Sequence, residues 1–376
     1  MYFFFKYVKI FCLLLFLRLV LNQYMNISGE CSDCMKYTSC KAATDHALYK
    51  QDDKTKKLFN DAFCGFVEMA RGSIPKVCCS DFPPLTMKVD ARFSSIGQEN
   101  TGKENLLPEQ CGHIYGDRII GGTNAKLYEF PWMALISYTT VDGVQFGCGG
   151  SIINSRYILT AAHCVINKKI AGVRVGEYNI DTVEDCDVGL NKVICEDHIQ
   201  DIYVEETISH ENYQSTPIVT NDIALIRVRD PIDFSFTNVA PICLPTSAEL
   251  RNKDLTNRNG TVAGWGVTET GTESSILLKV DVPVKSMSQC RSLYNRNAAP
   301  DVDRVENQFC AGQLNKDSCS GDSGGPLILQ EDYNNVNRYV QYGIVSHGPQ
   351  QCGSLFPGVY TDVRKFVAWI LKNIKE

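Results

Sequence analysis

Short apolar runs separated by glycine, asparagine and proline turns follow one another from residue 131 to residue 361. Each run is rich in Val, Ile, Leu or aromatic side chains, which fit the pleated surface of a strand. The runs are 132–138, 151–160, 173–175, 224–228, 261–265, 326–329, 340–346 and 358–361. Many short strands with turns between them predict an all-β fold with two antiparallel barrels.

The end of the chain has a different period. Apolar residues recur there at the spacing of one face of a helix, at Val363, Phe366, Val367, Ile370 and Ile374. Thr361 or Asp362 can accept a hydrogen bond from the first turn and so cap its N-terminus. We therefore predict a terminal helix after the last strand.

Residues 1–23 have the pattern of a secretory signal peptide. Lys6 and Lys9 precede the apolar run 11–17, and Arg18 interrupts it. An uncleaved membrane anchor is the alternative, but the apolar run is too short to span a bilayer comfortably. Of the seventeen cysteines, Cys12 lies in this segment, which leaves sixteen, an even number, for disulfides in an oxidising compartment. We predict a secreted, extracellular protein with no membrane span after signal removal.

The net charge bears on which partners the protein can bind, and two short motifs bear on its glycosylation. The formal net charge of −6 would repel a phosphate backbone and argues against a general nucleic-acid role. Asn26-Ile27-Ser28 and Asn259-Gly260-Thr261 match the acceptor pattern for N-glycosylation, so Asn26 and Asn259 are predicted glycosylation sites.

Residues 31–79 contain six cysteines in a segment too small to be stable through an apolar core alone. Disulfides are expected to hold it together, and six cysteines allow fifteen connectivities. A zinc site is the alternative for the pair Cys31 and Cys34, but no second pair of ligands follows at zinc-site spacing. The polar stretch that follows, within 80–118, contains prolines and glycines without a periodic apolar face and predicts a linker.

The segment 317–326, Asp-Ser-Cys-Ser-Gly-Asp-Ser-Gly-Gly-Pro, has the composition of a nucleophile loop. A serine hydroxyl is a weak nucleophile at neutral pH, so Ser323 needs a general base and a preformed place for the oxyanion. Gly321 leaves room for a turn in which its own N–H and that of Ser323 point at one spot. For a bare Gly-Asp-Ser cluster, an ordinary surface turn is the alternative.

Three motifs together resemble the trypsin-like serine proteases of the chymotrypsin fold. They are Leu159-Thr160-Ala161-Ala162-His163-Cys164, Asn221-Asp222-Ile223-Ala224-Leu225 and the loop around Ser323, in the chain order His, Asp, Ser. The resemblance implies that His163 is the base, that Asp222 holds its tautomer, that Ser323 is the nucleophile, and that the N–H groups of Gly321 and Ser323 form the oxyanion hole.

The cysteine pattern of 31–79 resembles the clip domain of arthropod serine proteases. The chain as a whole is similar to the clip-domain group that includes easter and the prophenoloxidase-activating enzymes. This implies a small disulfide-rich clip domain at 31–79, a linker and activation site at 80–118, and a protease domain at 119–376. That last domain would form two six-stranded antiparallel β-barrels with a C-terminal helix.

The resemblance further implies the disulfide pairing. In the clip domain the pairs are Cys31–Cys78, Cys34–Cys64 and Cys40–Cys79. Cys111 would pair with Cys243 and keep the clip segment attached after cleavage. In the protease region the pairs are Cys148–Cys164, Cys290–Cys310, Cys319–Cys352 and Cys186–Cys195.

The segment Asp117-Arg118-Ile119-Ile120-Gly121-Gly122 resembles the activation site of these proteases. Cleavage after Arg118 creates an ammonium at Ile119, which by resemblance inserts into the protein and pairs with Asp322. Before cleavage Asp322 lacks this partner, so the oxyanion turn is expected to be unformed. The chain would be a zymogen that another trypsin-like enzyme activates; a simple surface loop is the alternative.

Substrate choice is expected to depend on Asp317, which by resemblance lies at the base of the primary pocket. Its carboxylate would pair with Arg or Lys, and Gly348 and Gly358 at the pocket walls would leave room for the long side chain. His347 departs from the family, where an aromatic residue usually occupies that place. An imidazole changes its charge near its ordinary pKa of about 6.5, so His347 predicts pH-dependent substrate choice; a space-filling role is the alternative.

The lengthened loop between His163 and Asp222 carries oxygen donors of the type that calcium selects. The candidate ligands are Glu177, Asn179 and Glu184, with Asp185 and Asp187 beside them. A solvated acidic loop is the alternative, because the ligand spacing is not that of a defined calcium motif. No cofactor is expected to be required.

These observations predict a secreted trypsin-like zymogen that cuts protein substrates in an extracellular cascade. The resemblance implies roles in innate immunity, such as melanisation or Toll-ligand processing, or in development. Its expected partners are a downstream precursor, an upstream activating protease and an inhibitory serpin. An inactive homologue would lack the nucleophile or base, and a digestive trypsin would not need the N-terminal domain. A clip-domain protein whose main role is partner capture is the remaining alternative.

Overall fold

The computed structural model places the chain in two compact units, Met1–Ala91 and Arg92–Glu376. The structure describes residues 33–36, 39–40, 43, 57–58, 61–69, 72–82, 106–114, 123–188, 193–216, 218–268, 271–295, 307–314, 317–349, 352–354 and 356–376. The predicted signal peptide, Asn26, Cys31, Arg118 and Ile119 lie outside these residues. In the part of the chain so described, no helix is long and apolar enough to cross a membrane.

The first unit is a small antiparallel sheet held by disulfides. Its strands, in the order β1-β3-β2, are β1 (Cys34–Lys36), β3 (Gly72–Cys78) and β2 (Phe63–Met69), and the 3-10 turn η2 (Cys79–Asp81) follows β3. Cys34–Cys64 and Cys40–Cys79 are disulfides. The described core is small and comprises Cys40, Ala43, Ala62, Val77 and Phe82. A core of this size needs covalent support, which the two disulfides supply.

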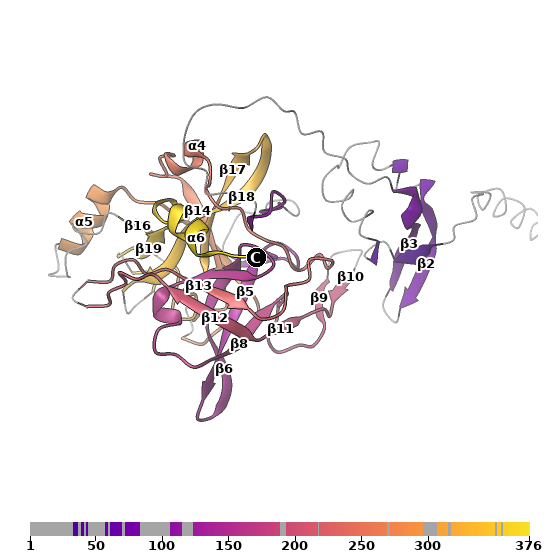
Figure 1. Cartoon of the computed structure of the whole chain (residues 1–376), viewed down its shortest axis with the longest axis horizontal. Helices are drawn as coiled ribbons and strands as arrows, with labels where there is room; N and C mark the ends of the chain where they lie inside the picture. Colours follow the sequence, from indigo (N-terminus) through magenta and orange to yellow (C-terminus); the bar gives the residue numbers. More distant parts are fainter. Residues whose placement is uncertain are drawn as a thin grey trace, which may run out of the picture. The chain divides into compact units, whose positions relative to one another are not determined.

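The second unit contains two antiparallel sheets (Figure 1). Within the described residues the first has the strand order β11-β8-β5-β6-β7-β13-β12. Its strands are β5 (Met133–Thr140), β6 (Gly143–Ile152), β7 (Tyr157–Thr160), β8 (Ile170–Val175), β11 (Gln200–Ile202), β12 (Val204–Ser209) and β13 (Ala224–Val228). A side hairpin pairs β9 (Asp185–Val188) with β10 (Val193–Glu196).

The second sheet has the order β16-β19-β18-β17-β14-β15-β4. Its strands are β4 (Thr123–Asn124), β14 (Asn259–Gly264), β15 (Leu278–Pro283), β16 (Gln308–Ala311), β17 (Pro326–Tyr333), β18 (Val336–His347) and β19 (Gly358–Asp362). Helices α4 (Ala248–Arg251) and α5 (Met287–Asn295) lie in its connections. Each sheet encloses an apolar core, with Trp132, Ile136 and Ile226 in the first and Val282, Leu327 and Tyr342 in the second.

Both sheets close on themselves, which confirms the predicted two-barrel fold. In the first, β11 pairs with β8 and β12 pairs with β13, and only Tyr203 separates β11 from β12. β11 and β12 are therefore two parts of one bent strand, so this sheet has seven labelled strands where six were predicted. In the second sheet, a bridge between Val284 and Ala311 joins the ends of β15 and β16. The two-residue β4 is the strand beyond the six that were predicted.

The strand predictions hold for the buried runs and fail at turns and edges. The predicted run 151–160 is two strands, because the backbone turns where Ile153 N–H bonds the carbonyl of Tyr157 at 3.0 Å. At the C-terminus the 3-10 turn η6 (Val363–Lys365) precedes helix α6 (Val367–Asn373). Asp362 caps the turn by accepting from Arg364 N–H, so one of the two predicted caps is used.

Part of the predicted linker belongs to the protease unit. Leu106 and Leu107 pack against the first barrel's core, and Asn154 Nδ2 donates to the carbonyl of Leu106 at 3.0 Å. Gly112 N–H bonds Pro241 O at 2.8 Å beside the Cys111–Cys243 disulfide. Residues 106–114 are thus an integral part of this unit, which composition alone did not indicate.

Gly112 provides a test of this packing. It has a φ of +58°, and a Cβ there would overlap the carbonyl oxygen of Tyr339. Gly271 has a φ of +80° but open space around it. Both Ala variants pay the left-handed backbone cost of about 1–2 kcal/mol, whereas only Gly112→Ala adds a backbone clash. We expect the midpoint of denaturant unfolding to fall clearly further for Gly112→Ala than for Gly271→Ala; equal losses would contradict the packing described here.

Candidate active site

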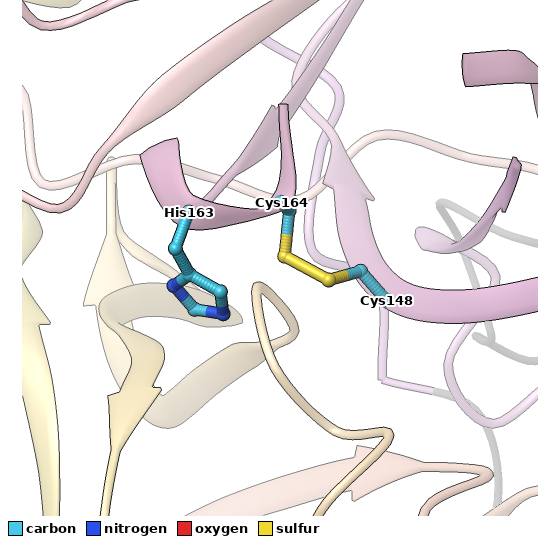
Figure 2. Close-up of side chains that lie close together, drawn as sticks. All are labelled: Cys148, His163 and Cys164. Carbon is cyan, nitrogen blue, oxygen red and sulfur yellow. A yellow bond between two sulfur atoms is a disulfide. The ribbon is translucent and has the colours of Figure 1, made fainter. Parts of the chain in front are cut away.

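His163 lies on a short turn at the end of a fully buried strand. Strand β7 leads through Ala161 into the 3-10 turn η4 (Ala162–Cys164), and both alanines are fully buried. Cys164 is tied to Cys148 of β6 by a disulfide, and Figure 2 shows the imidazole beside that bond. The close grouping of one imidazole and two sulfurs is not a metal site, since both sulfurs are in the disulfide. The bond fixes the turn that carries His163.

Asp222 meets His163 in the interior. The Asp222 side chain is fully buried. Its Oδ1 accepts from the His163 backbone N–H at 3.0 Å, and its Oδ2 lies 2.8 Å from His163 Nδ1. An ionised carboxylate can only accept, so Nδ1 carries the proton and Nε2 of neutral His163 has a free lone pair. This arrangement suits a general base at Nε2.

Ser346 is a second residue that donates to the Asp222 carboxylate, and the sequence did not single it out. Ser346 Oγ donates to Asp222 Oδ2 at 2.6 Å. Burial acts to raise the pKa of Asp222, but the hydrogen bonds and charge of His163, together with Ser346, hold that pKa below its usual value. The only sequence signal for Ser346 is its place in β18, directly before His347 and Gly348.

The loop with Ser323 packs against the strands that position His163. Gly149 N–H bonds the carbonyl oxygen of Ser323 at 2.8 Å, and Cys164 Sγ lies 3.7 Å from the same oxygen. Gly324 has a φ of +80°, and a Cβ there would overlap Thr160 Oγ1. The second barrel thus brings Ser323 to the first barrel's edge, and a glycine is required where the loop contacts β7.

The N–H groups of Gly321 and Ser323 are the candidate oxyanion donors. Neighbouring N–H groups of the loop bond backbone carbonyls: Asp322 to Cys319 O, Gly324 to Val345 O and Gly325 to Asp322 O. Among the residues the structure describes, none accepts from Gly321 N–H or Ser323 N–H. Two available donors beside a serine hydroxyl can stabilise a tetrahedral oxyanion.

Asp322 is held by backbone donors and by close glycines. Its Oδ1 accepts from Gly266 N–H at 3.0 Å and its Oδ2 from Cys319 N–H at 2.9 Å. A Cβ on Gly266 would lie 2.6 Å from Oδ1. Burial raises the pKa of Asp322 to about 6, although the hydrogen bonds from the two N–H groups act to lower it. No cationic side chain among the described residues forms an ion pair with this carboxylate.

Asp317 has a buried oxygen without a partner. Its Oδ1 accepts from Ser318 N–H at 2.9 Å and from Gly358 N–H at 3.2 Å. Its Oδ2 is buried and has no hydrogen-bond partner within the described residues. Burial raises the pKa of Asp317 to about 6 although the N–H groups of Ser318, Gly358 and Gly353 oppose it. An unpaired buried carboxylate oxygen is costly, so it favours a cation from outside.

Two glycines lie close together beside Asp317. A Cβ on Gly358 would lie 2.8 Å from Asp317 Oδ1, and one on Gly348 would lie 3.7 Å from the Cα of Gly358. Gly358 thus lies against the carboxylate and Gly348 lies against Gly358; their role as pocket walls stays a prediction. Any larger residue at Gly358 would collide with Asp317.

His347 is in contact with the Asp222 network. Its Nδ1 lies 3.2 Å from Ser346 Oγ. Burial, the largest cause, and the nearby His163 lower the pKa of His347, while Asp222 raises it. The net direction is downward, so the change of charge predicted near pH 6.5 moves to more acidic solution.

Two of the three predicted calcium ligands accept hydrogen bonds from protein donors. The carboxylate of Glu177 bonds Arg174 Nη1 at 3.2 Å, and Asn179 Oδ1 accepts from the N–H of Asp181 at 3.2 Å. Glu184 is exposed. Asp185, 2% exposed, accepts from two backbone N–H groups and a hydroxyl of its own loop. Glu177 and Asn179 are thus engaged by protein donors, while Glu184 is exposed; calcium binding stays a prediction.

The other predicted site residues are placed as follows. Within the described residues the protease unit has Cys111–Cys243, Cys148–Cys164, Cys186–Cys195, Cys290–Cys310 and Cys319–Cys352, the pairs that the resemblance implied. Cys78 is disulfide-bonded, but its expected partner Cys31 is outside the described residues. Asn259 is exposed at the start of β14.

Comparisons with known proteins cover both units. A family model described as Trypsin matches residues 119–370. The CLIP domain-containing serine protease HP8 of Bombyx mori is 38% identical, over 92% of each chain. Spaetzle-processing enzyme of Drosophila melanogaster is 34% identical, over 93% of this chain and 90% of that protein. Melanization protease 1 of the same organism is 44% identical, over 72% of this chain and 69% of its own.

A solved structure agrees with these matches. The crystal structure of the Drosophila Grass clip serine protease of the Toll pathway is 32% identical, with a TM-score of 0.64, and covers 90% of this chain and 93% of that chain. The similarity therefore includes the region before the protease domain as well as the domain itself. The chain belongs to the clip-domain serine proteases and is a serine endopeptidase with a trypsin-like fold.

Proposed function

We propose that this protein is the secreted zymogen of an endopeptidase that cuts protein substrates after Arg or Lys. The observation that carries the proposal is the buried, unpartnered Oδ2 of Asp317. Gly358 beside it has no side chain, and a Cβ there would lie 2.8 Å from Asp317 Oδ1, so a larger residue would obstruct the carboxylate. A guanidinium or ammonium would supply the missing hydrogen bonds and the opposite charge.

The proposed catalytic step uses the groups that surround Ser323. Ser323 Oγ attacks the carbonyl carbon of the bound Arg or Lys, and its proton passes to His163 Nε2. The resulting oxyanion accepts hydrogen bonds from Gly321 N–H and Ser323 N–H. His163 then gives the proton to the leaving amine as the C–N bond breaks, and water hydrolyses the acyl-enzyme by the same route. Asp222 stabilises the imidazolium throughout.

Cleavage after Arg118 is the proposed activating event. It would produce an ammonium at Ile119, the cation that Asp322 lacks among its described neighbours. The raised pKa of Asp322 supports this pairing, because a carboxyl destabilised by burial gains most from an opposite charge. The activating enzyme would itself cut after Arg. After cleavage the Cys111–Cys243 disulfide would retain the N-terminal segment.

We place the enzyme in an extracellular cascade. The support is that relatives of this chain are named Spaetzle-processing enzyme and Melanization protease 1. By similarity, the substrate would be a secreted precursor in innate immunity or development, and a serpin would end the activity. No cofactor is needed for the proposed step.

The specificity of the activated enzyme tests the pocket assignment. Asp317→Ser removes the charge that meets Arg or Lys, so kcat/KM for arginyl peptides should fall at least about a hundredfold while apolar residues are tolerated relatively better. The arginyl peptides and the peptides with an apolar residue are matched and differ only at the cleaved residue. Ser323→Ala is the control for contaminating protease and should be inactive on all of them. An unchanged preference in Asp317→Ser would refute the assignment.

The activation switch gives a second test. Arg118→Gln should remain uncut and inactive when a trypsin-like activator is added. Asp322→Asn should be cut yet stay nearly inactive, because a neutral amide cannot pair with the Ile119 ammonium. That ammonium should have a pKa above its free value of about 7.7–8.0, so wild-type activity is lost as pH rises through the raised value. Full activity of confirmed, cut Asp322→Asn would exclude this switch.

A further inference from the structure

Strand β18 passes the nucleophile loop and leaves one edge open there. Gly324 N–H bonds Val345 O at 2.8 Å, and Val345 N–H bonds Gly325 O at 2.9 Å. Pairing of β18 with β17 ends at Ile344 and Pro326. Within the described residues no strand continues it beside Ser346, His347 and Gly348. A substrate chain with its carbonyl at Ser323 and its side chain at Asp317 can extend upstream along this edge.

A bulge directs the His347 side chain. The register of β18 against β19 shifts between Val345 and His347, the latter being opposite Val359. Such bulges re-aim side chains and are frequent beside active sites. Normal alternation would put the side chains of Ser346 and His347 on opposite faces. Here instead His347 Nδ1 lies 3.2 Å from Ser346 Oγ.

The number of available protons decides which atom donates in the contact between Ser346 Oγ and His347 Nδ1. Asp222 has a lowered pKa and is ionised, so it can only accept, and Ser346 Oγ must donate its single proton to Asp222 Oδ2. Ser346 Oγ therefore has only lone pairs to offer to His347. It follows that His347 Nδ1 carries a proton and donates to Ser346 Oγ. Neutral His347 then has its free lone pair on Nε2.

The Nε2 atom of His347 is available to a ligand. It bonds no residue that the structure describes, and it is not among the fully buried polar atoms without a partner. The charged groups that act on the ring are Asp222 and His163, and burial with His163 outweighs Asp222 in lowering the pKa of His347. At neutral pH the ring is thus uncharged, and Nε2 is an acceptor. An aromatic hydrocarbon ring at this position would offer none.

We propose that His347 is a specificity-determining residue whose Nε2 accepts a hydrogen bond from a substrate side chain just upstream of the cleaved Arg or Lys. This inference rests on the proposed function. It predicts preference for a hydroxyl or amide side chain, Ser, Thr, Asn or Gln, over an apolar side chain of the same shape. The contact joins the substrate to Ser346 and Asp222 through one imidazole.

Peptides that contain Thr or Val test the proposal, because these two residues have the same shape and differ in a hydroxyl. The activated enzyme is compared with activated His347→Phe at about pH 8, where imidazole is neutral. Thr and Val are exchanged at each of the two positions before the cleaved arginine, one at a time. At one position we expect the Thr/Val ratio of kcat/KM to be about three- to tenfold higher in wild type than in His347→Phe.

The outcomes separate this inference from the proposed function. If wild type cleaves the arginyl peptides but shows no preference for Thr over Val at either position, the inference is wrong whatever the variant does. Equal ratios in both enzymes would also overturn it. Absence of any cleavage after arginine by the cut wild-type protein would instead refute the proposed function. If His347→Phe does not fold, His347→Leu provides the same comparison without an acceptor.

Discussion

A carboxylate that is buried away from water needs hydrogen-bond donors or cations as partners. The candidate active site of this protein contains three buried carboxylates, and they differ in how many such partners they have. Asp222 is fully buried and has His163 and Ser346. Asp322 has two backbone N–H groups and no cationic side chain among the described residues. Asp317 has one satisfied oxygen and one buried, unsatisfied oxygen. Only Asp222 has a full set of partners among the described residues. Asp317 and Asp322 do not, which explains why their pKa values are raised.

The fold supplies the remaining geometry by bringing two barrels together. His163 and Asp222 lie beside β7 and β13 of the first sheet, whereas Ser323 and Asp317 lie in the loop before β17 of the second. Contact between Gly149 and Ser323 joins the two halves. Glycine is needed at Gly266 and Gly358, where any Cβ would meet Asp322 or Asp317. The two carboxylates thus occupy the space that a side chain at Gly266 or Gly358 would take.

The sequence predicted features that depend on local residue types. Buried apolar runs such as Ala224–Val228 became strands with the same bounds, and the cysteines and the Gly-Asp-Ser-Gly loop indicated the family. Features that depend on distant contacts were missed. Ser346 is an ordinary serine until folding places it on Asp222. Residues 106–114 lack an apolar period, yet their leucines and disulfide fit a surface made by other segments. The sequence also could not show that Glu177 and Asp185 of the acidic loop accept hydrogen bonds from Arg174 and Tyr178.

Binding of a small aromatic amidinium, benzamidinium, measured by calorimetry, tests the central claim most directly. The claim is that Asp317 is a buried carboxylate without its cation. In activated Ser323→Ala protein, the ligand should bind tightly above pH 6 and progressively more weakly below it, with release of a proton, since a carboxyl of pKa about 6 must ionise to pair. Asp317→Asn in the same background should bind weakly at every pH without proton release. Equal affinity and pH dependence in the two proteins would contradict the account.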